Sequence, residues 1–281
     1  MTAPKKRRGL PLLLCLCMLA PRLFAETPAG TVPYRAALPP RLEIPKCAAS
    51  CSKKLAAKDH EMHAYEGFAL CYRESFEEAE WVAYELTPEK RAAAVSRGGT
   101  FISDPAISTG SASPADYVRS GYDRGHLAPA ADMRYSERAM RESFYMSNIT
   151  PQTPECNRGV WAQLERAVRA AAARGRAWVI SGPVLDKTTF PRIGENNVAV
   201  PEYHYKAVLL EVSGTEGERA LTAVGFIVPN RNPGRSYMDY ACTVDEVERR
   251  TGLDFFSALR NREEKAVERV FLREPWQQTE R

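Results

Sequence analysis

Histidine is scarce in this sequence, with four residues in 281. No acidic residue precedes Glu26, and the one apolar run before it, residues 10–20, is too short to cross a bilayer as a stable helix. The chain has no internal repeat and no second linker, which favours one large globular domain. Its hydrophobic content of 44% is sufficient to bury a substantial core.

The N-terminal segment has the layout of a secretory signal. A basic cluster, Lys5 to Arg8, precedes the apolar run 10–20, and Ala25 offers a small residue for cleavage before Glu26. We therefore expect residues 1–25 to be a signal peptide of an exported, periplasmic or secreted protein with no membrane span after cleavage. A retained membrane anchor is the alternative. A mitochondrial transit peptide fits less well, because the basic residues are not spread along an amphipathic helix.

Charge is balanced once this segment is set aside. Residues 1–25 hold five of the 39 Lys and Arg residues and none of the 35 Asp and Glu residues, which leaves 34 basic and 35 acidic residues. Global charge therefore gives no support to a polyanionic partner. Between residues 117 and 174, however, nine arginines and no lysine stand beside six acidic residues. Arginine suits two-point contacts to phosphate, although a solvated helical face of mixed charge is the alternative.

Cysteine is also sparse. Five cysteines follow the N-terminal segment: Cys47, Cys51, Cys71, Cys156 and Cys242. An exported chain can form disulfides, and Cys47 and Cys51 are spaced for a local loop closure. The odd number leaves at least one thiol unpaired or bridged between chains. A zinc site built from Cys47, Cys51, His60 and His63 is the alternative, with irregular spacing.

Proline separates an arm from a compact domain. The stretch from Glu26 to Pro45 is rich in proline and alanine and has no clear periodicity, so we interpret residues 26–62 as a linker or extended arm. The compact domain is expected over residues 63–276.

Apolar runs within this domain predict strands of one central sheet. They are rich in valine, isoleucine and tyrosine and are bounded by Gly, Pro or Asn. These runs are residues 81–86, 177–184, 198–212 and 220–228. Helices are interspersed without regular strand–helix alternation, so we predict an α+β fold with a mainly antiparallel central sheet.

Two segments have helical signals. Apolar residues recur at helical spacing between Asn157 and Ala173, with Gly175 placed as a terminator. The stripe consists of Val160, Leu164, Ala167 and Ala171. Thr243 and Glu246 form the pattern of a capping box, which opens a short helix that Gly252 ends.

The stretch from Tyr122 to Pro129 is the most informative part of the chain, because it places His126 between an arginine and a proline-bracketed turn. Phosphodiester hydrolysis needs a base to deprotonate water, a cation to neutralise charge, and donors that hold the phosphate. Imidazole titrates near neutral pH, with an unperturbed pKa of about 6.5, so His126 is the candidate base. A hydrogen-bonded turn histidine is the alternative.

Asn157 is the candidate metal ligand. Mg²⁺ commonly keeps several waters, so one protein carbonyl oxygen together with substrate phosphate oxygens can hold it. Mn²⁺ is a second candidate ion for the same ligands. The alternative role for Asn157 is a helix N-cap, which asparagine fills well.

Glu165 and Arg169 are four residues apart and therefore neighbours on one face of the predicted helix, with Asn157 and Trp161 on the same face. In the functional interpretation, Glu165 orients water around the ion and Arg169 stabilises the pentacovalent phosphate. The alternative is an exposed ion pair that contributes a few tenths of a kcal/mol, on the order of 0.3.

Several ordered motifs resemble the DNA/RNA non-specific endonuclease family, the metal-dependent nucleases with a ββα-metal finger. The first is Asp123-Arg-Gly-His126 with the following Leu-Ala-Pro129. Further motifs match in the same order, and the resemblance extends from about residue 81 to residue 256. These motifs are residues 147–152, 157–165, 181–184, 200–201 and 244–248.

The resemblance implies roles for individual residues. His126 takes the position of the general base, Asn157 that of the Mg²⁺ ligand, and Arg124 a position beside the phosphate. Asn148, Glu165 and Arg169 occupy supporting positions around the hydrated ion and the scissile phosphate: these three complete the predicted site. The family's strand–strand–helix finger implies that His126 lies on the strand side and Asn157 at the start of the helix.

Three residues depart from the family's pattern or leave it open. Cys156 directly precedes the metal-binding asparagine, where a thiol could be oxidised or bind a softer metal. Arg97 lies near the position of another phosphate-binding arginine, with uncertain register. His204, in a strand-like segment, is predicted to be structural.

Taken together, these features predict a Mg²⁺-dependent endonuclease that hydrolyses DNA and RNA with little sequence preference and contacts their phosphate backbone. A nucleic-acid-binding protein on a catalytically silent nuclease scaffold is one alternative. A structural exported protein that assembles through its cysteines is another. The resemblance also implies a homodimer as one option, since members of the family are often dimers. An inhibitor protein or strict export is expected, because such a nuclease endangers its own host, but the sequence identifies no such partner.

Overall fold

A computed structural model describes residues 31–34, 37–46, 59–92, 95–213, 219–231, 234–273 and 276 of the chain. The predicted signal peptide, residues 1–25, lies outside these residues, as do Cys47 and Cys51 of the predicted loop closure. None of the helices in the described ranges combines the length and the apolar character that a membrane crossing requires.

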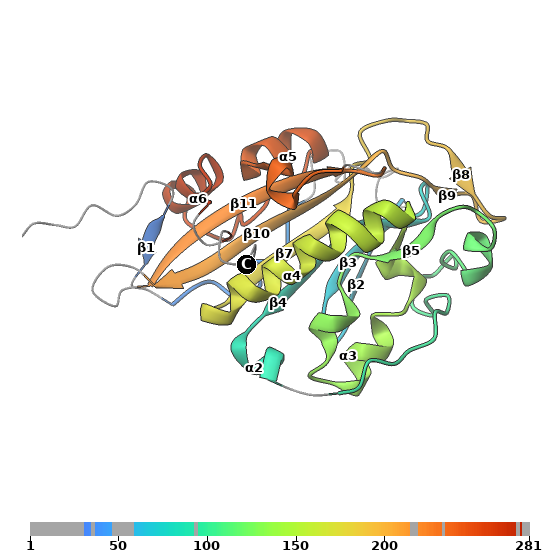
Figure 1. Cartoon of the computed structure of the whole chain (residues 1–281), viewed down its shortest axis with the longest axis horizontal. Helices are drawn as coiled ribbons and strands as arrows, with labels where there is room; N and C mark the ends of the chain where they lie inside the picture. The colour runs from blue at the N-terminus through green and yellow to red at the C-terminus, as the bar shows by residue number, and fades with distance from the viewer. Residues whose placement is uncertain are drawn as a thin grey trace, which may run out of the picture.

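A large antiparallel sheet forms the centre of the molecule (Figure 1). Its strands follow the order β1-β11-β10-β7-β4-β3-β2, and the short β12 pairs with β11 beside this path. The strands are β1 (Val32–Tyr34), β2 (His60–Ala64), β3 (Ala69–Arg73), β4 (Glu78–Leu86), β7 (Ala177–Pro183), β10 (Tyr203–Ser213), β11 (Arg219–Pro229) and β12 (Ala241–Cys242). The α+β prediction is confirmed.

Helices cover both faces of the sheet. The helices are α2 (Pro88–Ala92), α3 (Glu137–Glu142), α4 (Ala162–Ala171), α5 (Val244–Thr251) and α6 (Asn261–Glu268). Because side chains alternate along a strand, each strand supplies both cores. One core joins Val82 and Val179 to Leu164 of α4, and the other joins Trp81 and Ile180 to Val247 of α5. Figure 1 shows the yellow-green α4 on one side and the orange-red α5 and α6 on the other.

The predicted strands are confirmed with one change of boundary. The run 198–212 is not one strand, because Val198–Ala199 forms β9, which pairs with β8 (Arg192–Ile193) in a separate small sheet. Val200, Pro201 and Glu202 separate it from β10. The proline-rich arm contributes β1, which pairs with β11 at the sheet edge.

The predicted cap of α5 is half present. Thr243 Oγ1 accepts a hydrogen bond from Glu246 N at 3.2 Å, and Gly252 ends the helix with a φ of 73°. The Glu246 carboxylate instead accepts two hydrogen bonds from Arg249. The helix therefore begins and ends where the sequence predicts, but the side chain of Glu246 takes a different partner.

A strand–strand–helix unit lies over the face of the sheet that α4 covers. β5 (Asp123–His126) pairs antiparallel with β6 (Ile149–Gln152), so that His126 is opposite Ile149. The chain then passes through a π-type turn, Cys156–Trp161, into α4. This arrangement is the strand–strand–helix finger that the sequence resemblance implied.

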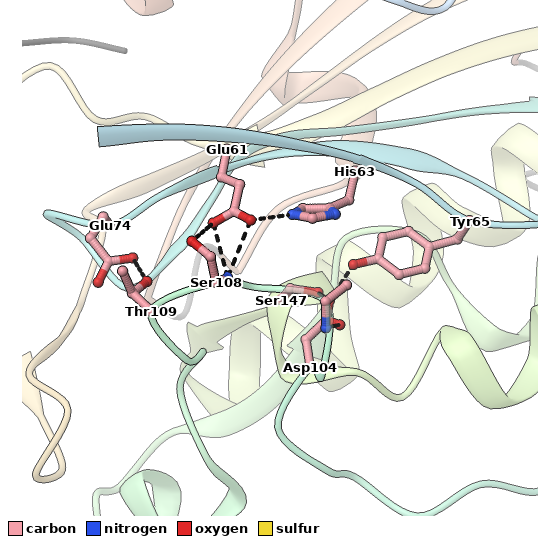
Figure 2. A network of polar contacts seen from close by, with 9 residues as sticks. Glu61, His63, Tyr65, Glu74, Asp104, Ser108, Thr109 and Ser147 are labelled. Atoms are coloured by element: carbon pink, nitrogen blue, oxygen red, sulfur yellow. Dashed lines mark hydrogen bonds and ion pairs between the residues drawn. The ribbon is translucent and has the colours of Figure 1, made fainter. Parts of the chain in front are cut away.

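Polar contacts fasten the long segment before β5 to the sheet (Figure 2). Ser108 donates its backbone N–H and its hydroxyl to Glu61 of β2. Asp104 accepts hydrogen bonds from Tyr65 and Ser147. These contacts hold in place the segment 95–113, which includes two residues of the cavity described next.

Candidate active site

His126 lies at the end of β5, where the strand pairing fixes its backbone. Its carbonyl oxygen accepts a hydrogen bond from Trp161 Nε1 at 3.1 Å. The imidazole packs against Phe101 and Phe144, with ring centroids 5.4 and 5.2 Å away. Two aromatic rings and a backbone clamp therefore restrict the orientation of the imidazole.

The surroundings of His126 keep its imidazole uncharged. Burial, together with the positive charge of Arg97, lowers the pKa of His126 to about 4. Its Nε2 atom is buried and has no hydrogen-bond partner among the described residues. An uncharged nitrogen without a partner is suited to accept a proton, as a general base must.

Asn157 is held by the first residue of β5. Its Nδ2 donates a hydrogen bond to Asp123 Oδ2 at 2.9 Å. Arg158 donates two more to the same carboxylate, both at 2.8 Å, and these bonds lower the pKa of Asp123. Since Asp123 can only accept, the amide oxygen of Asn157 is directed away from it and is available to a cation.

The segment around Asn157 differs from the regular helix that the sequence predicts. Residues 156–161 form a π-type turn, and Gly159 within it has a non-helical φ of −97° and ψ of −108°. Trp161 is fully buried in the core with Leu164, so it does not share an open helical face with Asn157. π-type turns are frequent at functional sites, and this turn brings Asn157 toward β5.

Glu165 and Arg169 do not form the ion pair that their spacing suggested. Arg169 Nη1 instead lies 2.9 Å from Oδ1 of Asp132, which is buried and also accepts a hydrogen bond from Tyr84 at 2.8 Å. Burial raises the pKa of Glu165. Arg169 is therefore paired with Asp132, whereas the carboxyl of Glu165 has a raised pKa and binds a proton more readily than an ordinary glutamate.

Two buried residues near this pair escaped the sequence analysis. Lys206 on β10 is fully buried, and its Nζ lies 4.6 Å from the centroid of the Trp161 ring. Burial lowers the pKa of Lys206, and the charge of Glu165 opposes this effect. Asp132 follows the Leu-Ala-Pro motif by three residues, and that nearness was the available signal. Lys206 interrupts the apolar run 198–212, and a charged residue within a predicted buried strand was the available signal.

A cavity of about 410 Å³ brings the predicted residues together. Its lining is dominated by arginines with one acidic residue, Glu165, which makes it a positively charged site for an anion. The lining residues that carry charge or chemistry are Arg97, Arg124, His126, Asn157, Arg158, Glu165, Arg166 and Arg169. Arg97 is thereby placed at the site, and the guanidinium of Arg124 lies 4.8 Å from the centroid of the Phe101 ring.

The cavity's donor set fits a hard divalent cation such as Mg²⁺. The amide oxygen of Asn157 and the carboxylate of Glu165 are both oxygen ligands, the kind this ion prefers. No group of three or more clustered His, Cys, Asp and Glu side chains occurs there in the described ranges. An ion at this site would be bound through these two protein oxygens together with water and substrate.

Asn148 is the predicted site residue that the structure places outside the cavity lining. Its side chain is fully buried and bonds to backbone on both sides. The Oδ1 atom accepts from Ala128 N, while Nδ2 donates to the carbonyls of Ala128 and Ser143, at 2.9, 2.9 and 2.8 Å. Asn148 therefore fixes the turn that follows His126.

His204 and Cys156, two further residues that the sequence singled out, are buried. His204 is fully buried, its Nε2 lies 3.1 Å from Thr150 Oγ1, and burial lowers its pKa to about 3, consistent with a structural role. Cys156 packs in the core, and burial raises the pKa of its thiol to about 12. Such a thiol remains protonated and is a poor metal ligand.

Comparison with known proteins reveals nuclease relatives. Mitochondrial nuclease EXOG of Xenopus laevis is 36% identical over 213 residues, which cover 71% of this chain and 59% of that protein. Mitochondrial endonuclease G of Homo sapiens is 32% identical and covers 69% of both chains. The chain spans less than two thirds of the length of the EXOG relatives. A solved complex of EndoG with EndoGI matches with a TM-score of 0.64 and 29% identity, covering 72% of this chain and 88% of that one.

These relatives contradict the predicted export. EXOG of Xenopus laevis and endonuclease G of Homo sapiens are both named as mitochondrial, so the comparisons do not support export. The misinterpretation arose because a basic cluster before an apolar run was assigned to a secretory signal. Disulfides, which followed from that assignment, also lack support: Cys156 and Cys242 form none.

The family model for DNA/RNA non-specific endonucleases matches residues 48–262. This range includes the antiparallel sheet strands β2–β11, the strand–strand–helix unit and every residue of the charged cavity. From the site geometry, the relatives and this match, we conclude that the chain belongs to the DNA/RNA non-specific endonuclease family.

Proposed function

We propose that the protein is an endonuclease that hydrolyses phosphodiester bonds of DNA and RNA, depends on Mg²⁺ and has little sequence preference. Mn²⁺ is the alternative ion. Family membership and relatives that are named nucleases support this proposal. The observation that carries it is the unpartnered, uncharged His126 Nε2 in an arginine-lined cavity that also contains Asn157.

His126 acts as the general base in this proposal. Its Nε2 accepts a proton from a water molecule, whose oxygen forms a bond to phosphorus as the bond between phosphorus and the 3′ oxygen breaks. The leaving 3′ oxygen takes a proton from solvent, so the products carry a 5′-phosphate and a 3′-hydroxyl. Asn157 would hold the divalent ion, which would supply positive charge to stabilise the phosphate and the leaving oxygen.

The remaining residues of the cavity bind and orient. Arg124 and Arg97 contact phosphate oxygens, and Arg169, fixed by Asp132, presents its remaining N–H groups to the same region. Glu165 orients water beside the ion. Contacts of this kind address only the backbone of the nucleic acid, so they carry no information about base sequence.

Nicking of supercoiled plasmid tests the proposal. The purified protein should nick plasmid and degrade single-stranded RNA with Mg²⁺, and excess chelator should abolish both activities. His126→Ala should lower kcat by about 10²–10⁴-fold with binding retained, and Asn157→Ala should lower activity and raise the Mg²⁺ requirement. His63→Ala, on β2, is the matched control and should retain full activity.

The same assay separates this proposal from its alternatives. A silent binding protein would bind the plasmid without chelator-sensitive nicking, and a structural protein would do neither. Either result would overturn the proposal. An inhibitor protein is a proposed partner, which the solved complex of EndoG with EndoGI supports, and a homodimer is a second one.

A further inference from the structure

Three side chains of different chemistry meet at the edge of the central sheet, on the face opposite α4. His60 lies on β2, Cys71 on β3 and Glu80 on β4. Their ligand atoms all lie within 4.8 Å of one another. Cys71 belongs to the core that packs against α5, so this cluster is separated from the arginine-lined cavity by the thickness of the sheet.

The distances within the cluster match the edges of a tetrahedral metal site. His60 Nδ1 lies 3.4 Å from Cys71 Sγ and 3.3 Å from Glu80 Oε2. Zinc binds nitrogen and oxygen at about 2.0–2.1 Å and sulfur at about 2.3 Å, which places tetrahedral ligand atoms about 3.3 to 3.6 Å apart. Two of the three edges are therefore already at the length that a bound zinc ion requires.

A β-bulge directs Glu80 into the cluster. In the pairing of β3 with β4, Cys71 is opposite Trp81 and Tyr72 is opposite Ala79, so Glu80 is the extra residue between them. Its carbonyl accepts a hydrogen bond from Tyr205 at 3.0 Å, which fixes the bulge. Bulges commonly re-aim a side chain, and here the carboxylate turns toward His60.

Arg73 orients the Glu80 carboxylate. It donates from Nη1 to Glu80 Oε1 at 2.9 Å and from Nε to Asp59 at 2.8 Å. The other oxygen, Glu80 Oε2, is buried, makes no hydrogen bond among the described residues and has only the ion-pair contact with His60 Nδ1 at 3.3 Å. Metal-binding carboxylates are commonly held in this way, with one oxygen bonded by a neighbouring residue.

We propose that His60, Cys71 and Glu80 form a second metal site, which binds zinc through three protein ligands with water in the fourth position. A thiolate, an imidazole and a carboxylate together suit zinc better than Mg²⁺. Their combined charge of −2 balances Zn²⁺, while Arg73 and Asp59 compensate one another. The ion ties β2, the last strand in the sheet order, to β3 and β4. This site does not depend on the proposed nuclease activity.

This cluster differs from the zinc alternative that the sequence offered. Cys47 and Cys51 of that alternative lie outside the described residues. His63 is directed elsewhere, because its Nε2 lies 2.8 Å from Glu61 (Figure 2). Only His60 is common to both sets of ligands.

Cobalt absorption tests the proposal directly. Co²⁺ added to the full-length protein, after removal of metals, should produce a thiolate-to-cobalt charge-transfer band and tetrahedral visible bands at one ion per chain. Zinc should displace both. The arginine-lined cavity contains no sulfur, so it cannot produce the charge-transfer band.

Matched variants identify the ligands. Cys71→Ser should abolish the band, while Cys242→Ser, a thiol outside the cluster, should retain it. His60→Gln should weaken binding by at least about 10-fold, while His63→Gln on the same strand should not. Mg²⁺-dependent nicking by His60→Gln remains as in the unaltered protein, which separates a failure here from a failure of the nuclease proposal.

The result that overturns the proposal is the absence of the band in the unaltered protein, or an equal band in Cys71→Ser. In that case, the cluster is held by hydrogen bonds alone. If Cys71→Ser does not fold, the pair His60→Gln and His63→Gln decides the outcome, because neither residue is fully buried. Zinc should also raise the Tm of the unaltered protein but not that of His60→Gln.

Discussion

At the scale of single residues, the protonation of His126 sets the pH range of the proposed hydrolysis. Burial and Arg97 lower its pKa from 6.5 to about 4, so the imidazole is a competent base at neutral pH and loses competence as the pH falls through about 4. We expect kcat/KM, which reports the free enzyme, to remain level from neutral pH to about pH 5 at saturating Mg²⁺. An acid limb near 6.5 in the unaltered protein would contradict this.

Arginine substitutions test the cause of that shift. Arg97→Ala removes a positive charge that disfavours the imidazolium of His126. The acid limb of the kcat/KM profile of this variant should therefore move to higher pH, toward 6.5. Arg166→Ala removes another arginine of the cavity lining that does not contribute to the shift, and it should leave the limb unchanged. The measurement is the pH at which kcat/KM falls, not the absolute rate, because both variants also weaken substrate binding.

In the proposed reaction, Asp123 positions Asn157, the ligand of the divalent ion. It holds the Asn157 amide at 2.9 Å, and loss of such a partner of a ligand commonly weakens metal binding by about 10–100-fold. Asp123→Ala should therefore raise the Mg²⁺ concentration for half-maximal activity by about that factor, with activity recovered at high Mg²⁺. Asp186→Ala, which breaks an ion pair with Arg250 elsewhere, is the control. A purely structural role would lower activity without recovery.

The sequence predicted which residues line the cavity better than it predicted their partners. His126, Asn157, Arg124, Glu165 and Arg169 all line it, because motif residues at fixed spacing carry the family's chemistry. The partner of Arg169 could not be predicted, since Asp132 reaches it from another segment of the chain. A helical spacing of four residues permits a contact but does not require one.

At the scale of elements, apolar periodicity correctly predicted the core-facing stripe of α4, but not its start. Leu164 and Ala167 are buried as predicted. The π-type turn at 156–161 leaves the same periodic pattern nearly intact, so the pattern alone could not reveal it. The contacts of Asn157 and Arg158 with Asp123 on β5 accompany this geometry, and such tertiary contacts override local propensity.

The side chain of Gln152 on β6 makes Gly125 sensitive to substitution. A Cβ at Gly125 would lie 2.4 Å from Cδ of Gln152, so this buried side chain would have to move, next to His126. Gly125→Ala should cost about 1–3 kcal/mol of unfolding free energy, measured in urea, and reduce nicking. Gly98→Ala, where a Cβ meets nothing within 4 Å, should change neither. Normal stability and activity of Gly125→Ala would show that the side chain of Gln152 relaxes without cost.

At the scale of the whole molecule, the centre of the sheet was predictable and its margins were not. β7, β10 and β11 are long and contain many apolar and β-branched residues. β1, in contrast, contains a proline and lies in a segment of linker composition. β1 exists because it pairs with the edge of β11, a contact distant in sequence. Short edge strands depend on such partners, so composition alone cannot predict them.

The placement of arginines on the two faces of the sheet predicts how nucleic-acid binding depends on salt concentration. The cavity arginines lie with α4 on one face, while Arg249 lies on α5, which packs on the other. Each phosphate contact contributes about 0.9 to the slope of log K against log salt concentration for duplex DNA. In the His126→Ala background, which prevents cleavage, Arg166→Ala should therefore reduce this slope by about 0.9, and Arg249→Ala should leave it unchanged. Fluorescence anisotropy with labelled duplexes measures both slopes, and an equal reduction in the two variants would mean that the nucleic acid is not confined to the cavity face.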